Sequence, residues 1–432
     1  MDDAGKQMEN GRSKRASSVT LRIEMRKIME QKKVLMTASV PSMIGQFNME
    51  NIRILKELGY EVHVACNFSD RSVWTGEKTA QFQKQMYEHG VACEQVAFSR
   101  SPLTLRQHIR SYQSLCRSMK REHYAFVHCH TPIAGAITRL ACARTGTKVV
   151  YTAHGFHFYR HAPLWNWLTY YPAEKWLSRV TDVLVTMNQE DYGRARRQLR
   201  AKKTVYIPGV GIDTGRFQSM GAGKQPHSMH PPDEKKQETA LDEKRKQLGI
   251  SKEDFVLLSV GELSRRKNHR LVLETLSRIK GTQIRYVICG IGEEEQALRR
   301  EAAKRGLDGR VIFAGYRTDV KEFYGMADLF VFPSLQEGLP VALMEAMAMG
   351  LPCLASDIRG NRDLLEHEKD TCLFSLDHPE MFRKKLEALM GNPLLRERVS
   401  RQNREEIRRF DKKRVNRRMR QIYEGMGEKI QR

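Results

Sequence analysis

Residues 333–352 read PSLQEGLPVALMEAMAMGLP, and residues 329–356 around them carry only two charges, both of them glutamates. Charged residues make up 29% of the whole chain, so an almost uncharged segment indicates a buried part of the fold. Pro340 suits the first position of a helix, and Gly350 suits its end. The helix between them is apolar all round, which predicts that it is buried.

The alternation of strand and helix extends from this helix in both directions. The apolar runs DLFVFPS (328–334) and LPCLAS (351–356) flank it, and strand, helix, strand is the unit of a parallel sheet. Near-continuous apolar runs are typical of strands that are covered on both faces. Further runs of this kind are KKVLMTASV (32–40), EVHVACNF (61–68), YAFVHCH (124–130), KVVYTAH (148–154), DVLVTMN (182–188), TVYIPG (204–209), FVLLSVG (255–261), IRYVICG (284–290) and VIFAG (311–315).

A polar segment, GAGKQPHSMHPPDEKKQETALDEK (221–244), divides the alternation and is predicted to be an exposed insertion or linker. The fold class is therefore α/β, with two doubly wound Rossmann-like domains that face a cleft. Ligands of such sheets bind at the carboxyl ends of the strands. The predicted parts are a disordered basic arm (1–31), an N-terminal domain (32–208), a linker with the insertion (209–250), a C-terminal domain (251–400) and a basic helix (401–432) that can cross back to the N-terminal domain.

The net charge, the cysteines and the lack of long apolar segments indicate what kind of protein this is. The 432 residues carry a net charge of +23, which favours an anionic partner such as nucleic acid, a membrane surface or a phosphorylated substrate. The eight cysteines stand singly, which favours reduced core cysteines over a zinc site. The chain has no apolar run of transmembrane length, and its start, MDDAGKQMENGRSKRASS, has no apolar core of a secretory signal, so a cytoplasmic protein is expected.

The two glutamates of the opening stretch need partners. Glu345 is the only charge of the buried helix, and burying a carboxylate costs several kcal/mol unless donors or a cation satisfy it. Glu337 precedes the helix at the carboxyl end of a strand, where the N–H of Gly338 and the helix dipole favour a phosphate. A sugar nucleotide supplies hydroxyls and a diphosphate. The alternative is that Glu345 pairs with a buried Arg or Lys and that Glu337 is an ordinary loop charge.

The spacing of these glutamates resembles the E-x7-E motif of the family-4 retaining glycosyltransferases, which have the GT-B fold. PSLQEGLPVALMEAMAMGLPCLAS, VIFAGYRTDV and YVICGIGEEEQALRREA are similar to this family in the C-terminal half. HCHTPIAGAITRLAC, TAHGFHFYRHAPLWNWL and IPGVGIDTGRF resemble its bacterial exopolysaccharide and capsule branch. The resemblance covers nearly all of residues 32–425, except the insertion.

The resemblance implies a role for each matching residue. Glu345 would hold the ribose hydroxyls of the donor, and Glu337 would contact the donor sugar. Lys267 would bind the diphosphate, and His154 would lie beside the reacting carbon. The other donor-binding residues that it implies are Gly45 in the first strand-to-helix loop, Gly338 and Leu339.

One position departs from the family pattern. Glu262 stands where the family often has an arginine, so Arg265 or Arg266 is expected to supply the second cation. Without the family resemblance, Lys267 would be read as an exposed surface lysine, and His154 as a core histidine whose nitrogens are hydrogen-bonded within the protein. The histidines of HCH (128–130) are expected to alternate on their strand, so that only one faces the cleft.

No DxD-type metal motif is present, in agreement with metal-independent GT-B chemistry. No cofactor is expected beside the nucleotide-sugar co-substrate, and the resemblance implies retention by front-face attack. The lead donor is a UDP-hexose or UDP-N-acetylhexosamine, with GDP-mannose next.

Basic and aromatic residues gather in two segments of the N-terminal half. Residues 95–121 contain six Arg or Lys and no acidic residue, and residues 156–176 contain eight aromatics. Such segments suit contact with an anionic membrane surface. The resemblance to the exopolysaccharide and capsule branch also implies a polyprenyl-diphosphate-linked acceptor. The alternative is a helix packed on the sheet with a solvated basic face.

The sequence thus predicts a retaining glycosyltransferase of polysaccharide biosynthesis, peripheral at the inner face of the membrane. One alternative is another GT-B sugar-nucleotide enzyme, such as a 2-epimerase. The other is a basic nucleic-acid-binding protein, although no recognition module is visible.

Overall fold

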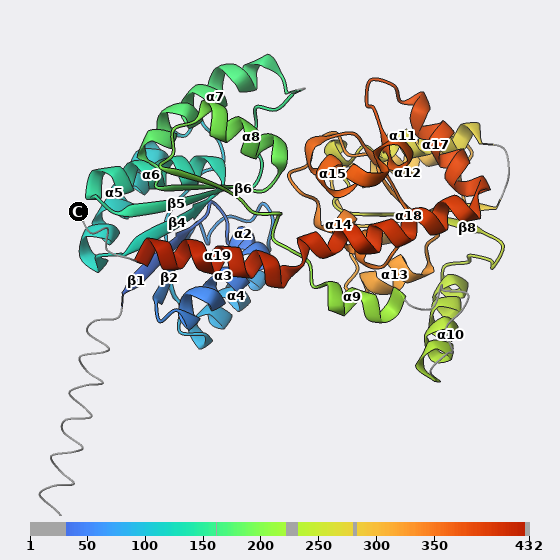
Figure 1. The fold of residues 1–432 in the computed structure, drawn as a ribbon, viewed down its shortest axis with the longest axis horizontal. Coiled ribbons are helices and arrows are strands. Elements are labelled where there is room, and N and C mark those ends of the chain that lie inside the picture. The colour runs from blue at the N-terminus through green and yellow to red at the C-terminus, as the bar shows by residue number, and fades with distance from the viewer. Residues whose placement is uncertain (1–31, 161, 222–231, 280–282, 428–432) are drawn as a thin grey trace, which may run out of the picture.

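The computed structural model describes residues 32–160, 162–221, 232–279 and 283–427. In these residues the chain forms two domains, each a parallel sheet covered by helices (Figure 1). The N-terminal sheet of the described chain has seven strands in the order β3-β2-β1-β4-β5-β6-β7, and the C-terminal sheet has six in the order β10-β9-β8-β11-β12-β13. The predicted pair of doubly wound domains is confirmed.

Each strand follows from an apolar run in the sequence, with two exceptions at sheet edges. β3 has the sequence ACEQ and no apolar run, and β13 has only two residues, so neither was predicted. The strands of the N-terminal sheet are β1 (Lys33–Thr37), β2 (Glu61–Cys66), β3 (Ala92–Gln95), β4 (Phe126–His130), β5 (Lys148–Ala153), β6 (Val183–Thr186) and β7 (Lys203–Tyr206). Those of the C-terminal sheet are β8 (Phe255–Val260), β9 (Ile284–Cys289), β10 (Val311–Gly315), β11 (Leu329–Phe332), β12 (Cys353–Ser356) and β13 (Leu373–Phe374).

Helices cover both faces of each sheet. Those of the N-terminal domain are α2 (Pro41–Phe47), α3 (Met49–Glu57), α4 (Gly76–Glu88), α5 (Leu105–Glu122), α6 (Pro132–Thr145), α7 (Leu164–Leu177) and α8 (Gln189–Gln198). After α9 (Thr214–Gly221) and α10 (Pro232–Gln247) come α11 (His269–Arg278), α12 (Glu295–Lys304), α13 (Val320–Met326), α14 (Val341–Ala348), α15 (Arg359–Leu364), α16 (Lys369–Cys372), α17 (Glu380–Gly391), α18 (Pro393–Glu406) and α19 (Lys412–Gly427).

The last helix returns to the first domain. Figure 1 shows α18 on the C-terminal domain and α19 crossing to the N-terminal domain, where it lies beside α3. Its apolar face joins the buried cluster of that domain through Val415, Met419, Ile422, Tyr423 and Met426. Burial of this face explains why a strongly basic segment is held in place.

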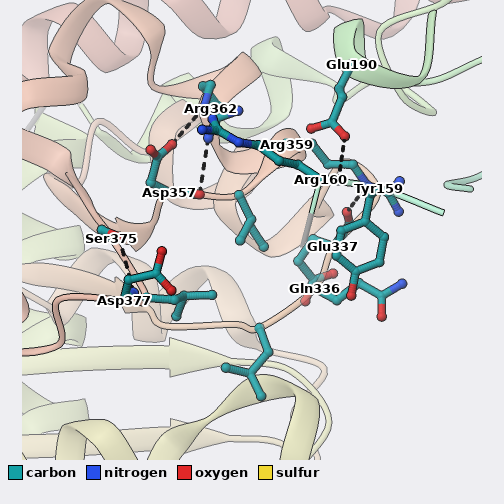
Figure 2. Close-up of a pocket in the computed structure, with 13 residues that line it drawn as sticks. Tyr159, Arg160, Glu190, Gln336, Glu337, Asp357, Arg359, Arg362, Ser375 and Asp377 are labelled. Atoms are coloured by element: carbon teal, nitrogen blue, oxygen red, sulfur yellow. Dashed lines mark hydrogen bonds and ion pairs between the residues drawn. The ribbon is translucent and has the colours of Figure 1, made fainter. Parts of the chain in front are cut away.

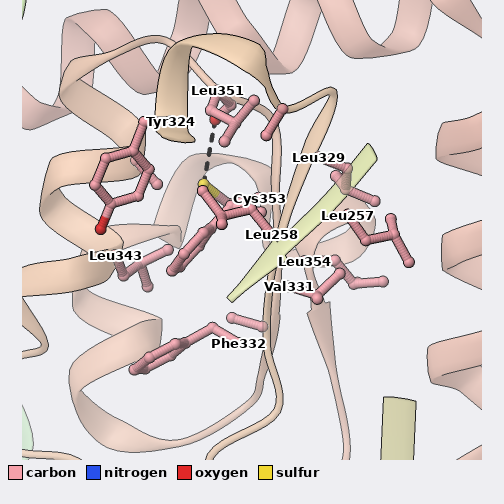
Figure 3. Close-up of a cluster of buried hydrophobic side chains, with 14 of the residues drawn as sticks. Leu257, Leu258, Tyr324, Leu329, Val331, Phe332, Leu343, Leu351, Cys353 and Leu354 are labelled. Carbon is pink, nitrogen blue, oxygen red and sulfur yellow. Dashed lines mark hydrogen bonds between the residues drawn. The ribbon is translucent and has the colours of Figure 1, made fainter. Parts of the chain in front are cut away.

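The helix of the opening sequence stretch is α14, and it packs inside the C-terminal domain. Leu343, Met344 and Met347 are buried in the core cluster. Figure 3 shows Leu343 in this cluster together with strand residues such as Leu258 and Val331. The helix starts one residue later than predicted, because Pro340 is its N-cap residue with an extended ψ of 121°. Gly350 follows the helix with a φ of +69°, which glycine adopts without strain.

The polar segment 221–244 differs from the prediction where the structure describes it. Residues 232–247 form α10, which packs against α13 rather than standing free. Leu241 contacts the core cluster, and the Lys244 ammonium pairs with Glu322 at 2.8 Å. These few contacts are enough to fix a helix whose sequence is mostly polar. The predicted arm (1–31) and residues 222–231 lie outside the described residues.

No helix in the described ranges has both the length and the apolar character needed to cross a lipid bilayer.

Candidate active site

A pocket of about 850 Å³, including the part that is open to solvent, lies between the two domains at the carboxyl ends of their strands. The N-terminal domain contributes Met43 of α2 and residues in and after β4 and β5. The C-terminal domain contributes the loop before α14, Arg266 after β8 and Arg359 at the start of α15. His154, Glu337 and Gly338, which the sequence analysis proposed from separate motifs, all line this pocket. Its walls are Met43, Thr131, Pro132, Tyr151, His154, Gly155, His157, Arg266, Gln336, Glu337, Gly338 and Arg359.

Two cations meet the carboxylate of Glu337. The Lys267 ammonium and the Arg266 guanidinium each lie 2.8 Å from Oε1 of Glu337. The Lys267 side chain is only 11% exposed and lies over the ring of Phe332, 4.4 Å from its centroid. Burial lowers the pKa of Lys267, and the Glu337 carboxylate opposes this shift. The pair places a desolvated cation at the edge of the pocket, where an anionic group of a ligand would meet it.

The N-terminus of α14 offers backbone donors beside this pair. In the described chain no acceptor is recorded for the N–H of Gly338 or Leu339, and Pro340 provides no side-chain cap. A Cβ on Gly338 would lie 2.1 Å from the carbonyl oxygen of His154, so only glycine fits where the two domains meet. Unsatisfied N–H groups at a helix N-terminus favour a phosphate.

Glu345 lies within α14 itself and is held by a tyrosine rather than by a cation. Its Oε2 accepts a hydrogen bond of 3.0 Å from the hydroxyl of Tyr324, which also lies 3.0 Å from the carbonyl oxygen of Ala342. Burial raises the pKa of Glu345, while the Tyr324 hydrogen bond and the charge of Arg216 lower it in part. The alternative of a buried ion pair with Arg or Lys is therefore not what the structure shows, and one carboxylate oxygen keeps capacity for a ligand hydroxyl.

His154 directly follows β5 and belongs to a cluster of three histidines with His128 and His130. Its Nε2 lies 3.1 Å from Nδ1 of His130, and the ring centroids of His130 and His128 are 4.1 Å apart. Both histidines of HCH therefore face the same way, and the expectation that they alternate was wrong, because residues two apart on a strand share a face. His128 also bonds the hydroxyl of Tyr423 on α19 at 2.8 Å. Burial lowers the pKa of His154 to about 4, so this imidazole is neutral at pH 7.

This burial predicts acid sensitivity. In the unfolded chain a histidine takes up its proton near pH 6.5, whereas His154 in the folded protein does so near pH 4. The folded state thus gains stability from neutral His154 above pH 6.5 and loses it as pH falls toward 4. His154→Asn removes this proton uptake, so we expect the stability advantage of the wild type over the variant to shrink by roughly 2 kcal/mol between pH 6.5 and 5.

Urea unfolding of both proteins at several pH values measures this difference. Between pH 7 and 8 the difference should stay constant, which is the internal control. A difference independent of pH from 8 down to 5 would contradict the buried, neutral state of His154.

Gly45 and Arg265, two of the proposed donor-binding residues, do not line this pocket, and the predicted loop position of Gly45 was wrong. Gly45 lies inside α2 rather than in a loop, and a Cβ there would lie 2.4 Å from the ring of Trp74. The cause is Pro41, which starts a helix directly after the β1 loop. Arg265 is 86% exposed and pairs with Glu294 at 3.4 Å. Arg266 is the arginine that turns to Glu337, since a 3-10 turn points neighbouring side chains in different directions.

Leu339 is half-buried against the C-terminal core, and its side chain faces Gly209, where a Cβ would lie 2.6 Å from Cδ2 of Leu339. Its backbone, rather than its side chain, is therefore the part available to a ligand.

The sequence analysis missed the ion pair that joins the domains. The Arg359 guanidinium lies 2.9 Å from Oδ1 of Asp191, and their side chains are 3% and 0% exposed. Nε of Arg359 also donates to the carbonyl oxygen of Glu337 at 3.1 Å. Thr131 was missed too: it lines the pocket with a φ of +65°, a conformation that is rare outside glycine. No sequence pattern marks these residues, because each depends on a neighbour from another domain or strand.

Comparisons with known proteins agree over both domains. Glycosyltransferase Family 4 matches residues 45–216, and Glycosyl transferases group 1 matches residues 241–406. The putative glycosyltransferase EpsD of Bacillus subtilis is 33% identical over 91% of this chain and 96% of that protein. The UDP-Gal:alpha-D-GlcNAc-diphosphoundecaprenol alpha-1,3-galactosyltransferase of Escherichia coli is 30% identical over 65% of this chain and 70% of its own. The crystal structure of Anabaena HepE in complex with UDP and glucose has a TM-score of 0.70 at 18% identity, covering 91% of this chain and 100% of that one.

Two Rossmann-like domains that enclose a pocket of this kind define the GT-B architecture, and the similarity to the HepE structure supports it. The chain belongs to the group 1/family 4 glycosyltransferases, as the resemblance in the sequence implied.

Proposed function

We propose that this glycosyltransferase moves a hexose or N-acetylhexosamine from a UDP-sugar to a lipid-linked saccharide in polysaccharide biosynthesis, with retention and without a metal ion or other cofactor. The observation that carries the proposal is the buried Lys267–Glu337 pair beside the unsatisfied N–H groups of Gly338 and Leu339. This arrangement provides a cation and backbone donors for a diphosphate, and a carboxylate for sugar hydroxyls.

The proposed reaction breaks the bond between C1 of the donor sugar and the β-phosphate oxygen of UDP. Lys267 and the α14 N-terminus stabilise the negative charge that develops on the leaving diphosphate. An acceptor hydroxyl attacks C1 from the same face, and its proton passes to the leaving phosphate. Glu345 binds the ribose hydroxyls, and Glu337 positions the donor sugar. Neutral His154 hydrogen-bonds the sugar near the reacting carbon.

The names of similar proteins support the choice of substrates. The Escherichia coli relative is named for UDP-Gal and a GlcNAc-diphosphoundecaprenol acceptor, and HepE was crystallised with UDP and glucose. WcaL of Escherichia coli, 28% identical over 46% of this chain, is named as a putative colanic acid biosynthesis glycosyltransferase. A UDP-sugar donor and a polyprenyl-diphosphate-linked acceptor are therefore the partners proposed for this chain.

The decisive experiment is a thermal-shift series of the purified protein with UDP, GDP and ADP in the presence of EDTA. We expect UDP to raise Tm selectively, because a ligand that binds only the folded state stabilises it. The Glu345→Gln variant should show a smaller UDP shift, and retention would be read from the anomeric configuration of the product.

If no nucleotide raised Tm, the result would contradict the proposal and favour the nucleic-acid-binding alternative. Conversion of the UDP-sugar to an isomer without an acceptor would instead indicate an epimerase.

The surface of the N-terminal domain supports a peripheral contact with an anionic membrane. On α7, Leu164 and Trp165 are 81% and 72% exposed, and at the start of α5 Leu105 and Ile109 are exposed next to Arg106. Apolar side chains beside basic ones suit an anionic bilayer surface. We expect the protein to co-sediment with anionic vesicles at low salt. Equal binding to neutral vesicles, or no binding to anionic vesicles, would contradict a peripheral contact with an anionic membrane.

A further inference from the structure

A second pocket adjoins the candidate active site at the domain interface (Figure 2). Gln336, Glu337 and Arg359 line both pockets, so the two spaces share a wall. The second space amounts to about 870 Å³, including the part that is open to solvent. Its lining includes Glu337, which the proposed function assigns to the donor sugar, but neither Lys267 nor Glu345, so it extends beyond the proposed diphosphate and ribose contacts.

The other walls come from both domains. The N-terminal domain contributes Tyr159 and Arg160 after β5, and Glu190 of α8. The C-terminal domain contributes the ends of β11, β12 and β13. The C-terminal wall residues outside the shared three are Leu335, Asp357, Ile358, Arg362, Ser375, Leu376 and Asp377.

We propose that this pocket binds an uncharged sugar residue of the acceptor, next to the sugar that is glycosylated. The inference rests on the proposed function, since it assigns the acceptor of that same reaction.

The charges of the pocket argue against a phosphate and for a sugar. Four of its residues are acidic and three are arginines, and most of them are already neutralised by protein partners. Of the pocket arginines, Arg160 alone has no carboxylate partner in the described chain, so a diphosphate that recruited a second cation would have to displace an existing ion pair. Sugar hydroxyls can instead share the remaining lone pairs and N–H groups without adding charge. The pairs are Arg362–Asp357 at 2.8 Å, Arg359–Asp191 at 2.9 Å, Glu337–Lys267 at 2.8 Å and Glu190–Arg194 at 3.0 Å.

The apolar part of the lining also fits a pyranose ring, which has apolar C–H faces between its hydroxyls. Tyr159 presents an aromatic ring, which the guanidinium of Arg359 holds in place at 4.9 Å from its centroid. Leu335 and Ile358 add aliphatic surface from the opposite domain. Small-molecule sites usually combine apolar and aromatic walls with a small number of oriented polar groups, and Tyr159, Leu335 and Ile358 supply the apolar part here.

The position of the pocket fixes what the acceptor must be. Its reacting sugar lies beside His154 in the first pocket, and the next sugar lies in the second pocket beyond Gln336 and Arg359. The acceptor therefore carries at least two sugars. The reaction that supplies it must itself be a glycosyl transfer.

Saturation-transfer NMR of the UDP-bound protein with glucose, galactose and N-acetylglucosamine at millimolar concentration tests this. We expect at least one sugar to bind, and Tyr159→Ala and Asp377→Ala to weaken its binding about tenfold. The matched controls are Tyr87→Ala and Asp370→Ala, which change exposed residues of the same types elsewhere. Both controls should bind the sugar as the wild type does.

A measurement on the wild type alone avoids any folding defect of the variants. The methyl signal of Ile358 should shift on addition of the sugar, whereas that of Ile44, buried in the N-terminal core, should not. The proposal is overturned if no sugar binds, if both pocket variants bind like the wild type, or if inorganic diphosphate displaces the sugar. A folded protein that fails to bind UDP would instead overturn the proposed function.

Discussion

Replacing Lys267 with alanine is expected to lower kcat for sugar transfer about 100- to 1000-fold, which corresponds to about 3–4 kcal/mol of transition-state stabilisation. Lys267 is 11% exposed, and its ammonium lies 2.8 Å from Glu337 at the edge of the interdomain pocket. A cation in a desolvated site acts more strongly on developing charge than one in water. The effect should fall on kcat more than on KM, because the diphosphate gains charge as the bond to the sugar breaks.

The matched control is Arg265→Ala, from the same turn of the chain. Arg265 is 86% exposed and bonded to Glu294, so its loss should change kcat by no more than about twofold, as is usual for surface substitutions. Steady-state kinetics with the donor identified by thermal shift measures both variants. Near-normal activity of Lys267→Ala, or an equally large loss in Arg265→Ala, would overturn the assignment of the diphosphate cation.

Replacing Arg359 with methionine is expected to separate the two domains. Asp191 would then remain fully buried, with only the N–H of Phe156 and the amide of Asn188 as donors. Leaving one partner of a buried pair uncompensated costs about 3–5 kcal/mol. Burial already raises the pKa of Asp191 despite the neighbouring guanidinium. Opening of the cleft hydrates the carboxylate at lower cost than unfolding, and it also releases the Glu337 carbonyl oxygen from Arg359.

Small-angle X-ray scattering and donor kinetics together measure this effect. We expect a larger maximum dimension and a loss of activity in Arg359→Met, and partial recovery of both when Asp191→Asn is added. Arg139→Met is the control, because Arg139 pairs with Glu174 at 2.8 Å within the N-terminal domain, with side chains 1% and 10% exposed. That variant should lower the free energy of unfolding without a change in dimension. A compact Arg359→Met with normal activity would contradict the coupling.

Much of the fold could be predicted because burial repeats along the sequence. Strands such as β8 and β9 are buried on both faces, so their residues form unbroken apolar runs. The prediction failed where the run was short or polar. β3 is a half-exposed edge strand without an apolar run. α10 is held by a few contacts to α13, which could not be predicted from its mostly polar sequence.

The candidate site was predictable in part for the same reason. Glu337 and Glu345 stand out because they interrupt an apolar segment, and Lys267 and His154 were found through the family resemblance. The structure adds what surrounds them. The hydroxyl of Tyr324 supplies the hydrogen bond that Glu345 requires, although 21 positions separate the two in sequence.

By itself, the sequence determined two α/β domains, a buried helix α14 and a pair of carboxylates in need of polar partners, because apolar periodicity and the cost of burying charge are properties of the chain read locally. The tertiary structure alone decided that Arg266 rather than Arg265 meets Glu337, and that Gly45 faces Trp74. It also decided that Arg359 binds Asp191, 168 positions away. These contacts depend on the rotation of single turns and on the docking of two domains, and both are set by packing between segments that are distant in the sequence.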